Sequence, residues 1–246
     1  MNQKQLLNAC NPEFNFDSFF MYDGNKTAYL TCKEICRNIR VKYNPIFIYS
    51  ETALGKTHLL QASIQELLKE RENINIEYFG WEEFLNNYIK ALHNKTVGEY
   101  RNRMQRADML IFESVNCLAN KNKLQGEFFN IINSLYDNNK QIVLTSDRLP
   151  CKIKGLNSNL LSRFENMFIV KLYPPDLEAR LAILKKKQEE KKIILDDEIM
   201  LFIAKRIKSN IRCLEGALIS LNAFSSLTGI PVNMVNVEKL LKPFSF

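Results

Sequence analysis

The fold can be inferred from one stretch of the sequence, Pro45-Ile46-Phe47-Ile48-Tyr49-Ser50-Glu51-Thr52-Ala53-Leu54-Gly55-Lys56-Thr57. It opens on an apolar run and ends in most of a phosphate-binding loop, whose complete pattern is G-x-x-x-x-G-K-[ST]. In such a loop backbone N–H groups surround phosphate oxygens, the lysine reaches the β and γ phosphates, and the hydroxyl holds Mg²⁺. Gly55, Lys56 and Thr57 fit this pattern, while Ser50 replaces its first glycine. We expect a nucleotide site here; the alternative is an ordinary strand-turn-helix connection.

The residues around the loop have the periodicity that such a site needs. Apolar side chains follow the loop at the spacing of one helix face, at Leu60, Ile64, Leu67 and Leu68. Further apolar runs, separated by helical patterns, predict strands at 74–79, 108–113, 141–145 and 167–172. Strands that alternate with helices form a parallel sheet with helices on both faces, and ligands bind at the carboxyl ends of its strands.

The pattern changes after Tyr173-Pro174-Pro175, because every segment beyond this break is helical in its spacing. The expected helices cover 177–190, 196–207, 211–226 and 235–241. We therefore predict an N-terminal tail and linker over 1–24, a three-layer α/β nucleotide-binding domain over 25–173 and a small all-helical domain over 174–246.

Composition describes a globular protein with a substantial core, since 46% of the 246 residues are hydrophobic. No apolar stretch approaches the roughly 20 residues that span a bilayer, and the polar N-terminus does not resemble a signal peptide, so we expect a cytoplasmic protein. Six cysteines without a C-x-x-C pair argue against a zinc site and a disulfide framework. His58 and His93 give no support to a histidine-based catalytic triad.

The formal net charge of +7 favours an anionic partner, such as nucleic acid or a phosphate-rich surface. Charge alone does not choose between these partners. A basic surface that is merely solvated is the alternative.

Seven stretches occur in an order that is more specific than the phosphate loop alone. They are 11–19, 43–49, 54–60, 126–129, 141–148, 161–164 and 212–218. Together they resemble the AAA+ ATPases, and among these the DnaA family of bacterial replication initiators. The resemblance covers nearly the whole chain and implies an AAA+ domain followed by a helical lid.

The resemblance also implies roles for single residues. Adenine nucleotide, ATP or ADP with Mg²⁺, would bind at Ser50, Ala53, Gly55, Lys56, Thr57 and His58. Asp147 stands at the family's first sensor and Arg212 at its second sensor, which contacts phosphate from the lid. Arg163 stands at the arginine finger, which reaches into the nucleotide of a neighbouring subunit; a surface salt bridge is the alternative. Each role is physically reasonable, because cations and donors offset the charge of a γ-phosphate.

A helical insertion over 84–106 has a counterpart in the DnaA family, where it mediates assembly and touches single-stranded DNA. Here it carries four candidate DNA-binding residues, Lys95, Arg101, Arg103 and Arg106. A basic face backed by an apolar one suits contact with a phosphate backbone. An ordinary solvated helix face is the alternative. Related regulators such as Hda lack this insertion.

Two departures from the family affect the site. Side chains at Ser50 and Ala53, where the family usually has glycine, would crowd the phosphates or oppose a positive φ. The family has paired aspartates after the apolar strand, and here we expect Phe112 at the position that orients Mg²⁺ and Glu113 at the position that polarises the attacking water. Hydrolysis should then be weak or absent. Alternatively, Phe112 only packs, and the site survives on Thr57, Glu113 and Asp147.

Three functions remain open. The chain could be the ATP-binding assembly domain of a DnaA-type initiator, which joins other DnaA-like subunits on DNA. It could be a nucleotide-free paralogue, related in function to Hda, that regulates through protein contacts. It could also be a working ATPase. The family's helix-turn-helix domain does not follow the lid, which leaves open whether the chain is a fragment or a short paralogue.

Overall fold

The computed structural model describes residues 3–39, 43–71 and 73–242. They form two compact units. One holds the sheet and the helices around it up to Leu172; the other holds the helices after Tyr173, together with the short segments Tyr22–Gly24 and Thr52–Gly55. Among the described residues, no helix combines the length and apolar character needed to cross a membrane.

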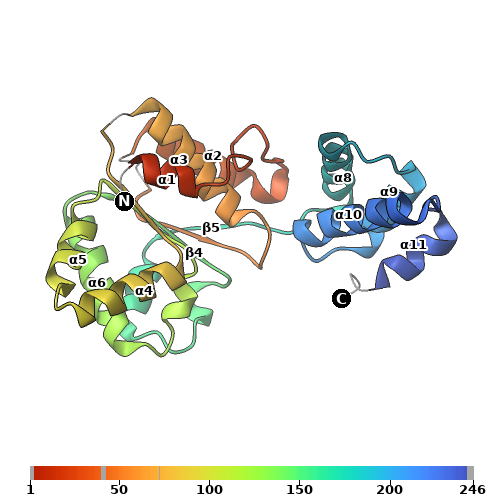
Figure 1. The fold of residues 1–246 in the computed structure, drawn as a ribbon. Helices are drawn as coiled ribbons and strands as arrows, with labels where there is room; N and C mark the ends of the chain where they lie inside the picture. The colour runs from red at the N-terminus through yellow and green to blue at the C-terminus, as the bar shows by residue number, and fades with distance from the viewer. Residues whose placement is uncertain (1–2, 40–42, 72, 243–246) are drawn as a thin grey trace. The chain divides into compact units, whose positions relative to one another are not determined.

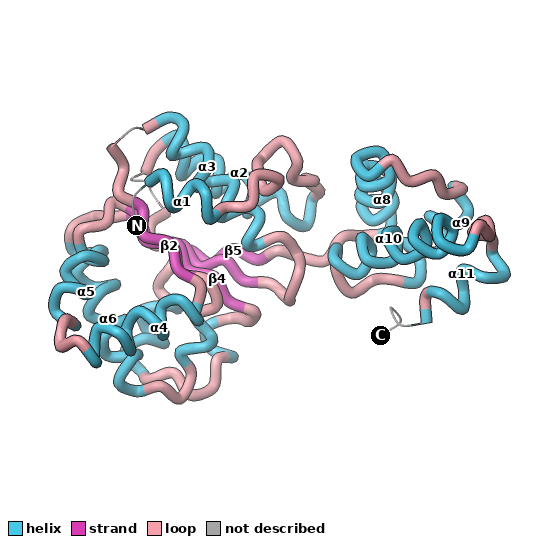
Figure 2. Tube along the Cα trace, in the orientation of Figure 1, coloured by secondary structure: helices cyan, strands magenta, loops and turns pink. Residues whose placement is uncertain are grey.

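A five-stranded sheet organises the first unit (Figures 1 and 2). Its strands are β1 (Ile46–Tyr49), β2 (Ile76–Phe79), β3 (Met109–Phe112), β4 (Gln141–Ser146) and β5 (Phe168–Lys171). The spatial order is β2-β3-β4-β1-β5, and every pairing is parallel. The predicted parallel α/β fold is therefore confirmed. Strands β1 to β4 are almost fully buried, as expected for a parallel sheet covered on both faces, whereas β5 at the sheet edge is partly exposed.

Helices cover both faces of this sheet (Figure 1). One layer contains α1 (Gln3–Ala9), α2 (Asp23–Arg37) and α3 (Lys56–Glu70), and the other contains α4 (Trp81–His93), α5 (Val97–Gln105) and α6 (Asn122–Asp137). The short η1 (Val115–Leu118), η2 (Pro150–Lys152) and α7 (Ser158–Glu165) complete the unit. Cys32 and Cys36 are buried on α2, on the same helix face as Ala28 and Ile35.

Phenylalanine rings that meet edge to face or at a tilt form part of the core between the sheet and the second helix layer. The Phe112 ring lies 5.0 Å from Phe84 of α4 and 4.7 Å from Phe128 of α6, measured between ring centres. Phe164 of α7 lies 5.6 Å from Phe47 of β1. All five rings are at most 2% exposed. Such pairs add about 0.5–1.5 kcal/mol each beyond the burial of their area, so the insertion helix α4 is anchored directly on β3.

The N-terminal segment packs on α3 instead of forming a free tail. Gln65 Nε2 donates hydrogen bonds to the carbonyl oxygens of Asn11 at 3.0 Å and Phe14 at 2.6 Å. The His58 ring stacks on Phe14 at 4.8 Å and meets the edge of Phe19 at 5.1 Å. Residues 3–21 therefore belong with the sheet unit, within the region predicted as tail and linker.

The second unit is a bundle of α8 (Leu177–Lys191), α9 (Asp197–Arg206), α10 (Ile211–Thr228) and α11 (Met234–Leu240). Its core contains Leu184, Ile203, Leu214, Leu218 and Val237, all fully buried. Side-chain caps fix the helix starts: Asp176 accepts from the Ala179 N–H and Asn210 from the Cys213 N–H. Such caps stabilise a helix by about 1 kcal/mol each.

An ion pair ties the insertion to the sheet. Arg103 Nε of α5 lies 3.2 Å from Glu77 Oε1 of β2, and the Glu77 side chain is only 3% exposed. Burial raises the pKa of Glu77, and the nearby Arg103 charge opposes that rise. The Arg103 guanidinium also lies over the rings of Phe79 and Tyr100, at 5.7 and 5.5 Å. Arg103 is thus part of the packing of α5.

We expect Arg103→Ala to lower the free energy of unfolding at neutral pH by about 1–2 kcal/mol, since it removes the Arg103 charge from beside a buried carboxylate while Arg103 itself is half exposed. The loss should shrink as the pH falls and Glu77 takes up a proton. Urea unfolding measures it, with the exposed Arg106→Ala as control. Equal losses in the two variants would contradict the structural role.

Candidate nucleotide site

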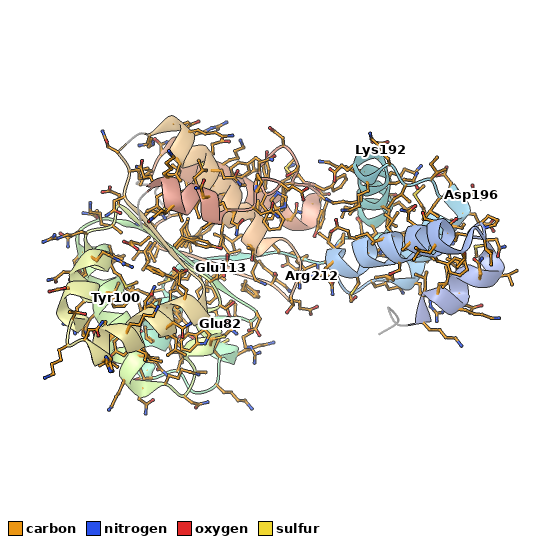
Figure 3. The ribbon with its side chains drawn as sticks, viewed as in Figure 1. Glu82, Tyr100, Glu113, Lys192, Asp196 and Arg212 are labelled. Atoms are coloured by element: carbon orange, nitrogen blue, oxygen red, sulfur yellow. The ribbon has the colours of Figure 1, made fainter. Side chains whose placement is uncertain are left out.

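The carboxyl ends of the three middle strands bring the predicted site residues to one edge of the sheet. The phosphate loop follows β1 and leads into α3, Glu113 directly follows β3, and Asp147 directly follows β4. Because β1 and β3 both pair with β4 in parallel, these segments meet. Thr57 Oγ1 donates a hydrogen bond of 2.8 Å to Glu113 Oε2. Figure 3 marks Glu113 within this unit.

The backbone of the loop has the shape of an anion-binding turn. Gly55 has a φ of 97° and Ala53 a φ of 62°, and α3 begins at Lys56. The first N–H groups of a helix have no partner within the helix and attract phosphate. Of the two departures from the family, only Ala53 takes a left-handed conformation, which costs about 1–2 kcal/mol for an L-residue. Ser50 has no positive φ, so its backbone does not require glycine.

Lys56 is held by its own loop. Its ammonium donates to Ser50 O at 2.7 Å, to Ser50 Oγ at 2.8 Å and to Glu51 O at 3.0 Å. Ser50 is 1% exposed. Burial lowers the pKa of Lys56 to about 8, against the opposing charges of Asp147 and Glu113. The serine that replaces the first glycine therefore supplies an extra acceptor, and phosphate oxygens must displace it.

The structure corrects the assignment of Phe112. Successive side chains of a strand point to opposite faces, and Phe112 points into the core between Phe84 and Phe128. The carboxylate beside Thr57 belongs to Glu113. Glu113 is therefore the carboxylate that faces Thr57, and Ser114 is the residue that follows it. This geometry fits the alternative in which Phe112 only packs and Thr57 and Glu113 remain at the site.

Asp147 lies at the site edge and is already paired. Arg148 donates to both Asp147 carboxylate oxygens at 2.7 Å, and this bonding lowers the pKa of Asp147. Both residues line a cavity of about 560 Å³ with Cys151, Lys152 and Lys154. Asp147 also contributes to the field that acts on Lys56.

Arg163 and Arg212 lie on different helices. Arg163 of α7 donates to Asn133 Oδ1 at 2.6 Å and lies 4.8 Å from the Tyr136 ring centre, and both partners belong to α6. Within the described chain Arg163 has no ion pair, so the surface salt bridge considered above is not formed. Arg212 is exposed in the first turn of α10, in the helical unit. The roles of both arginines stay predictions.

His58 serves the N-terminal segment. Its Nε2 lies 2.8 Å from Asn15 O and 3.3 Å from Ser18 Oγ, between two aromatic rings. This ring nitrogen therefore contacts the N-terminal segment. The phosphate-loop pattern places His58 only by its distance in sequence from Lys56, so it could not reveal this contact with the N-terminal segment.

The four basic candidates of the insertion divide into two pairs. Arg101 donates to both carboxylate oxygens of Glu127, at 2.7 and 2.9 Å, and Arg103 pairs with Glu77. Lys95 and Arg106 have exposed side chains. A phosphate backbone would meet Lys95 and Arg106 without breaking an internal pair.

Sequence reasoning missed Tyr78 of β2 and Gln61 of α3. Tyr78 Oη donates to Glu113 Oε1 at 2.6 Å, and Gln61 Nε2 donates to Tyr78 Oη at 3.3 Å. With Glu113 and Ser114 they line a cavity of about 540 Å³, which Trp81, Glu82 and Glu83 also border. One signal in the sequence could have pointed to Tyr78. Side chains alternate along a strand, so β2, like β3, brings one side chain near its carboxyl end toward the site edge.

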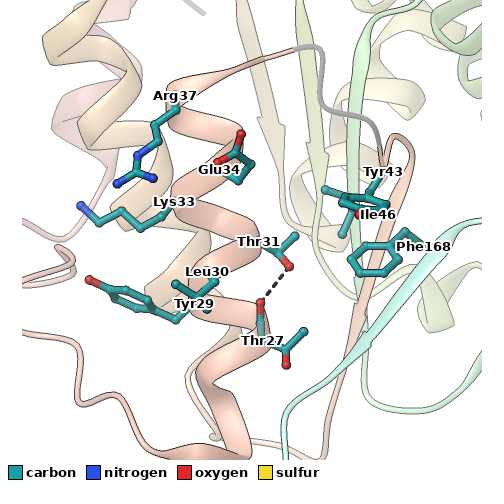
Figure 4. A pocket seen from close by; sticks show the side chains of 10 residues that line it. All are labelled: Thr27, Tyr29, Leu30, Thr31, Lys33, Glu34, Arg37, Tyr43, Ile46 and Phe168. Atoms are coloured by element: carbon teal, nitrogen blue, oxygen red, sulfur yellow. Dashed lines mark hydrogen bonds between the residues drawn. The ribbon is translucent and has the colours of Figure 1, made fainter.

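A further pocket, of about 480 Å³, is a groove between α2 and β5 (Figure 4). Leu30, Tyr43 and Phe168 give it an apolar wall, and the Thr31 hydroxyl bonds back to Thr27 O. Lys33 at its rim pairs with Glu66 at 2.8 Å. This groove has no phosphate loop and stays outside the nucleotide site.

A phosphate loop between β1 and α3, at the carboxyl edge of a parallel sheet ordered β2-β3-β4-β1-β5, defines an ATPase domain of the AAA+ class. The motor protein RuvB of Thermotoga maritima, at 17% identity and a TM-score of 0.65, shares this fold.

Comparison with known proteins shows the family. Residues 10–171 match the family model of the bacterial DnaA ATPase domain, and the chain belongs to the DnaA family. It is 39% identical over 239 residues to the chromosomal replication initiator protein DnaA of Citrifermentans bemidjiense, covering 97% of this chain and 52% of that protein. It is 42% identical over 232 residues to DnaA of Limosilactobacillus reuteri, covering 94% and 53%. The chain spans about half the length of these relatives.

Two solved structures are similar over almost the whole chain. Domain III of Thermotoga maritima DnaA gives a TM-score of 0.87 at 34% identity, covering 96% of this chain and 98% of that one. A replication initiator DnaA bound to AMPPCP and single-stranded DNA gives a TM-score of 0.82 at 34% identity, covering 94% and 69%.

We expect Ser50→Ala and Ser50→Gly to raise ATP affinity about threefold to tenfold, since each removes a hydroxyl that competes with phosphate for Lys56. Calorimetric titration measures the change. The alanine variant distinguishes competition by the hydroxyl from crowding by the side chain. A gain in affinity seen only in Ser50→Gly would indicate crowding. Unchanged affinity in both variants would contradict the competition.

Nucleotide affinity should fall as the pH rises above about 8. The Lys56 ammonium is present below its pKa of about 8, and bound phosphate stabilises it, so binding above this pH requires proton uptake. The dissociation constant should then rise about tenfold per pH unit. Titrations across this range measure it, with Lys56→Gln expected to bind weakly at every pH. A wild-type constant that does not change with pH would exclude Lys56 as the titrating group.

Proposed function

We propose that this chain is the nucleotide-binding assembly domain of a DnaA-type replication initiator. It binds ATP or ADP with Mg²⁺, joins other DnaA-like subunits and contacts single-stranded DNA through its insertion, with weak or absent hydrolysis. The hydrogen bond between Thr57 and Glu113 carries the proposal, because it brings together the hydroxyl and the carboxylate that a metal ion needs, and the phosphate-binding Lys56 feels the Glu113 charge.

The residues at this edge fit Mg²⁺. Hydroxyl and carboxylate oxygens are the ligands that this ion prefers, and Thr57 Oγ1 and Glu113 Oε2 lie 2.8 Å apart. Thr57 would bind the ion directly and Glu113 would hold it, directly or through its water shell. When bound, Mg²⁺ supplies charge stabilisation for the β and γ phosphates. The loop amides and Lys56 orient the same phosphates.

The same geometry supports weak hydrolysis for a reason different from the one first expected. The metal-side acid is present as Glu113, whereas Ser114 offers a hydroxyl in place of the second acid. Ser114 has a φ of 63°, and its N–H donates to Thr145 Oγ1. A serine is a poor base at neutral pH, so a water beside it is not activated. Substantial Mg²⁺-dependent turnover that Lys56→Ala abolishes would overturn this part of the proposal.

The surfaces support assembly and DNA contact. Arg163 is held on α6 by Asn133 and Tyr136, which presents its guanidinium in a fixed position suited to a neighbouring subunit's phosphate. Lys95 and Arg106 are exposed cations of the insertion, and Arg101 and Arg103 are paired with carboxylates. A relative of similar structure is bound to AMPPCP and single-stranded DNA.

A nucleotide-free regulatory paralogue is the second candidate. The contacts of Lys56 with Ser50 and the left-handed Ala53 favour it, since both oppose phosphate binding. Titration with ATP and with ADP decides between the two: binding that Lys56→Ala abolishes supports the nucleotide-binding domain, and no binding supports the paralogue.

The double variant Lys95→Glu/Arg106→Glu should weaken binding of a single-stranded oligonucleotide. The slope of log affinity against log salt should fall by about 1.4, since about two phosphate contacts are lost. Fluorescence anisotropy measures both quantities in the presence of ATP. Lys26→Glu/Lys69→Glu, with the same charge change on the opposite helix layer, is the control. Equal effects of the two variants would mean that only net charge matters.

A further inference from the structure

A continuous row of hydrogen bonds leads from the N-terminal segment to the metal-side carboxylate. The Asn11 N–H donates to Gln61 Oε1 at 2.8 Å, and Gln61 Nε2 donates to Tyr78 Oη at 3.3 Å. Tyr78 Oη donates to Glu113 Oε1 at 2.6 Å, while Thr57 Oγ1 donates to Glu113 Oε2 at 2.8 Å. The two oxygens of Glu113 are therefore held from two different elements, β2 and α3.

The direction of every bond in this row is fixed. A phenol has one proton, so Tyr78, which donates to Glu113, must accept from Gln61. Gln61 must present its oxygen to Asn11, which leaves its NH₂ group for Tyr78. Burial and the Glu113 charge raise the pKa of Tyr78, so its hydroxyl keeps the proton at neutral pH.

This support matters more for glutamate than for aspartate. Glutamate has one more rotatable bond, and an unsupported carboxylate would populate several rotamers beside Thr57. Tyr78 removes that freedom by a short, charge-assisted hydrogen bond. Groups that orient a metal ligand in this way are worth about 10–100-fold in metal affinity. Glu113 is thus prepared for a metal in the free protein.

We propose that Tyr78 and Gln61 are positioning residues of the Mg²⁺–nucleotide site, and that Gln61 connects this site to the docked N-terminal segment. The inference rests on the proposed nucleotide-binding function. Tyr78 acts on the metal through Glu113, and Gln61 acts through Tyr78. Neither side chain needs to contact nucleotide.

The test compares AMPPCP affinity in Mg²⁺ with the affinity in EDTA, by calorimetry on the whole chain. In Tyr78→Phe, which keeps the buried ring, the gain due to Mg²⁺ should fall about tenfold while the EDTA affinity is unchanged. Tyr43→Phe, which also removes one phenolic hydroxyl and leaves its ring on Phe168, should retain the full gain.

The variant Gln61→Met tests the relay, by which we mean the row of hydrogen bonds from Asn11 through Gln61 and Tyr78 to Glu113. It should lower the gain in AMPPCP affinity due to Mg²⁺ about threefold. The double variant Gln61→Met/Tyr78→Phe should show the same gain as Tyr78→Phe alone, because Gln61 acts only through Tyr78. Additive losses in the double variant would contradict the relay.

The failures can be told apart. If wild type binds AMPPCP and Tyr78→Phe keeps the full Mg²⁺ gain, with only its melting temperature lowered, then Tyr78 is merely structural and this inference is overturned. If wild type binds AMPPCP in neither condition, the proposed nucleotide-binding function fails, and the inference fails with it.

Discussion

The parallel direction of all five strands is the constraint on which the site depends. Parallel strands end at one edge, so residues that follow β1, β3 and β4 meet although they are far apart in sequence. The same alternation of side chains that sends Phe112 into the phenylalanine core brings Glu113 to Thr57. Packing of the insertion and placement of the carboxylate are therefore two results of one strand register.

The three charged groups that meet at this edge each have a partner within the protein. Lys56 is held by Ser50 and Glu51, Asp147 by Arg148, and Glu113 by Thr57 and Tyr78. Partners are needed because a buried charge without compensation is costly. Nucleotide must replace some of these bonds with its own, so its affinity is the difference between two well-satisfied arrangements. The bond from Ser50 Oγ to Lys56 is one that the family's glycine would not form.

Much of the fold could be predicted from sequence, because the phosphate loop, the strand periodicity and the break at Pro174-Pro175 are local signals. The site was predicted less fully. Local pattern cannot tell which of Phe112 and Glu113 faces the edge, since that depends on packing against Phe84 and Phe128. The partners of Arg101 and Arg103 lie far away in sequence, on α6 and β2, so both arginines looked free for DNA. The relay through Gln61 and Tyr78 joins three elements and leaves no local pattern.

A crystal structure of the chain with AMPPCP and Mg²⁺ would show whether Thr57 and Glu113 hold the ion while Lys56 turns from its own loop to phosphate. We expect Thr57 Oγ1 to ligate the ion and Glu113 to contact it or one of its waters. We also expect Lys56 Nζ to have left Ser50 Oγ for a phosphate oxygen. A bound nucleotide with Lys56 still on Ser50, or an ion held without Glu113, would show that these residues do not have these roles.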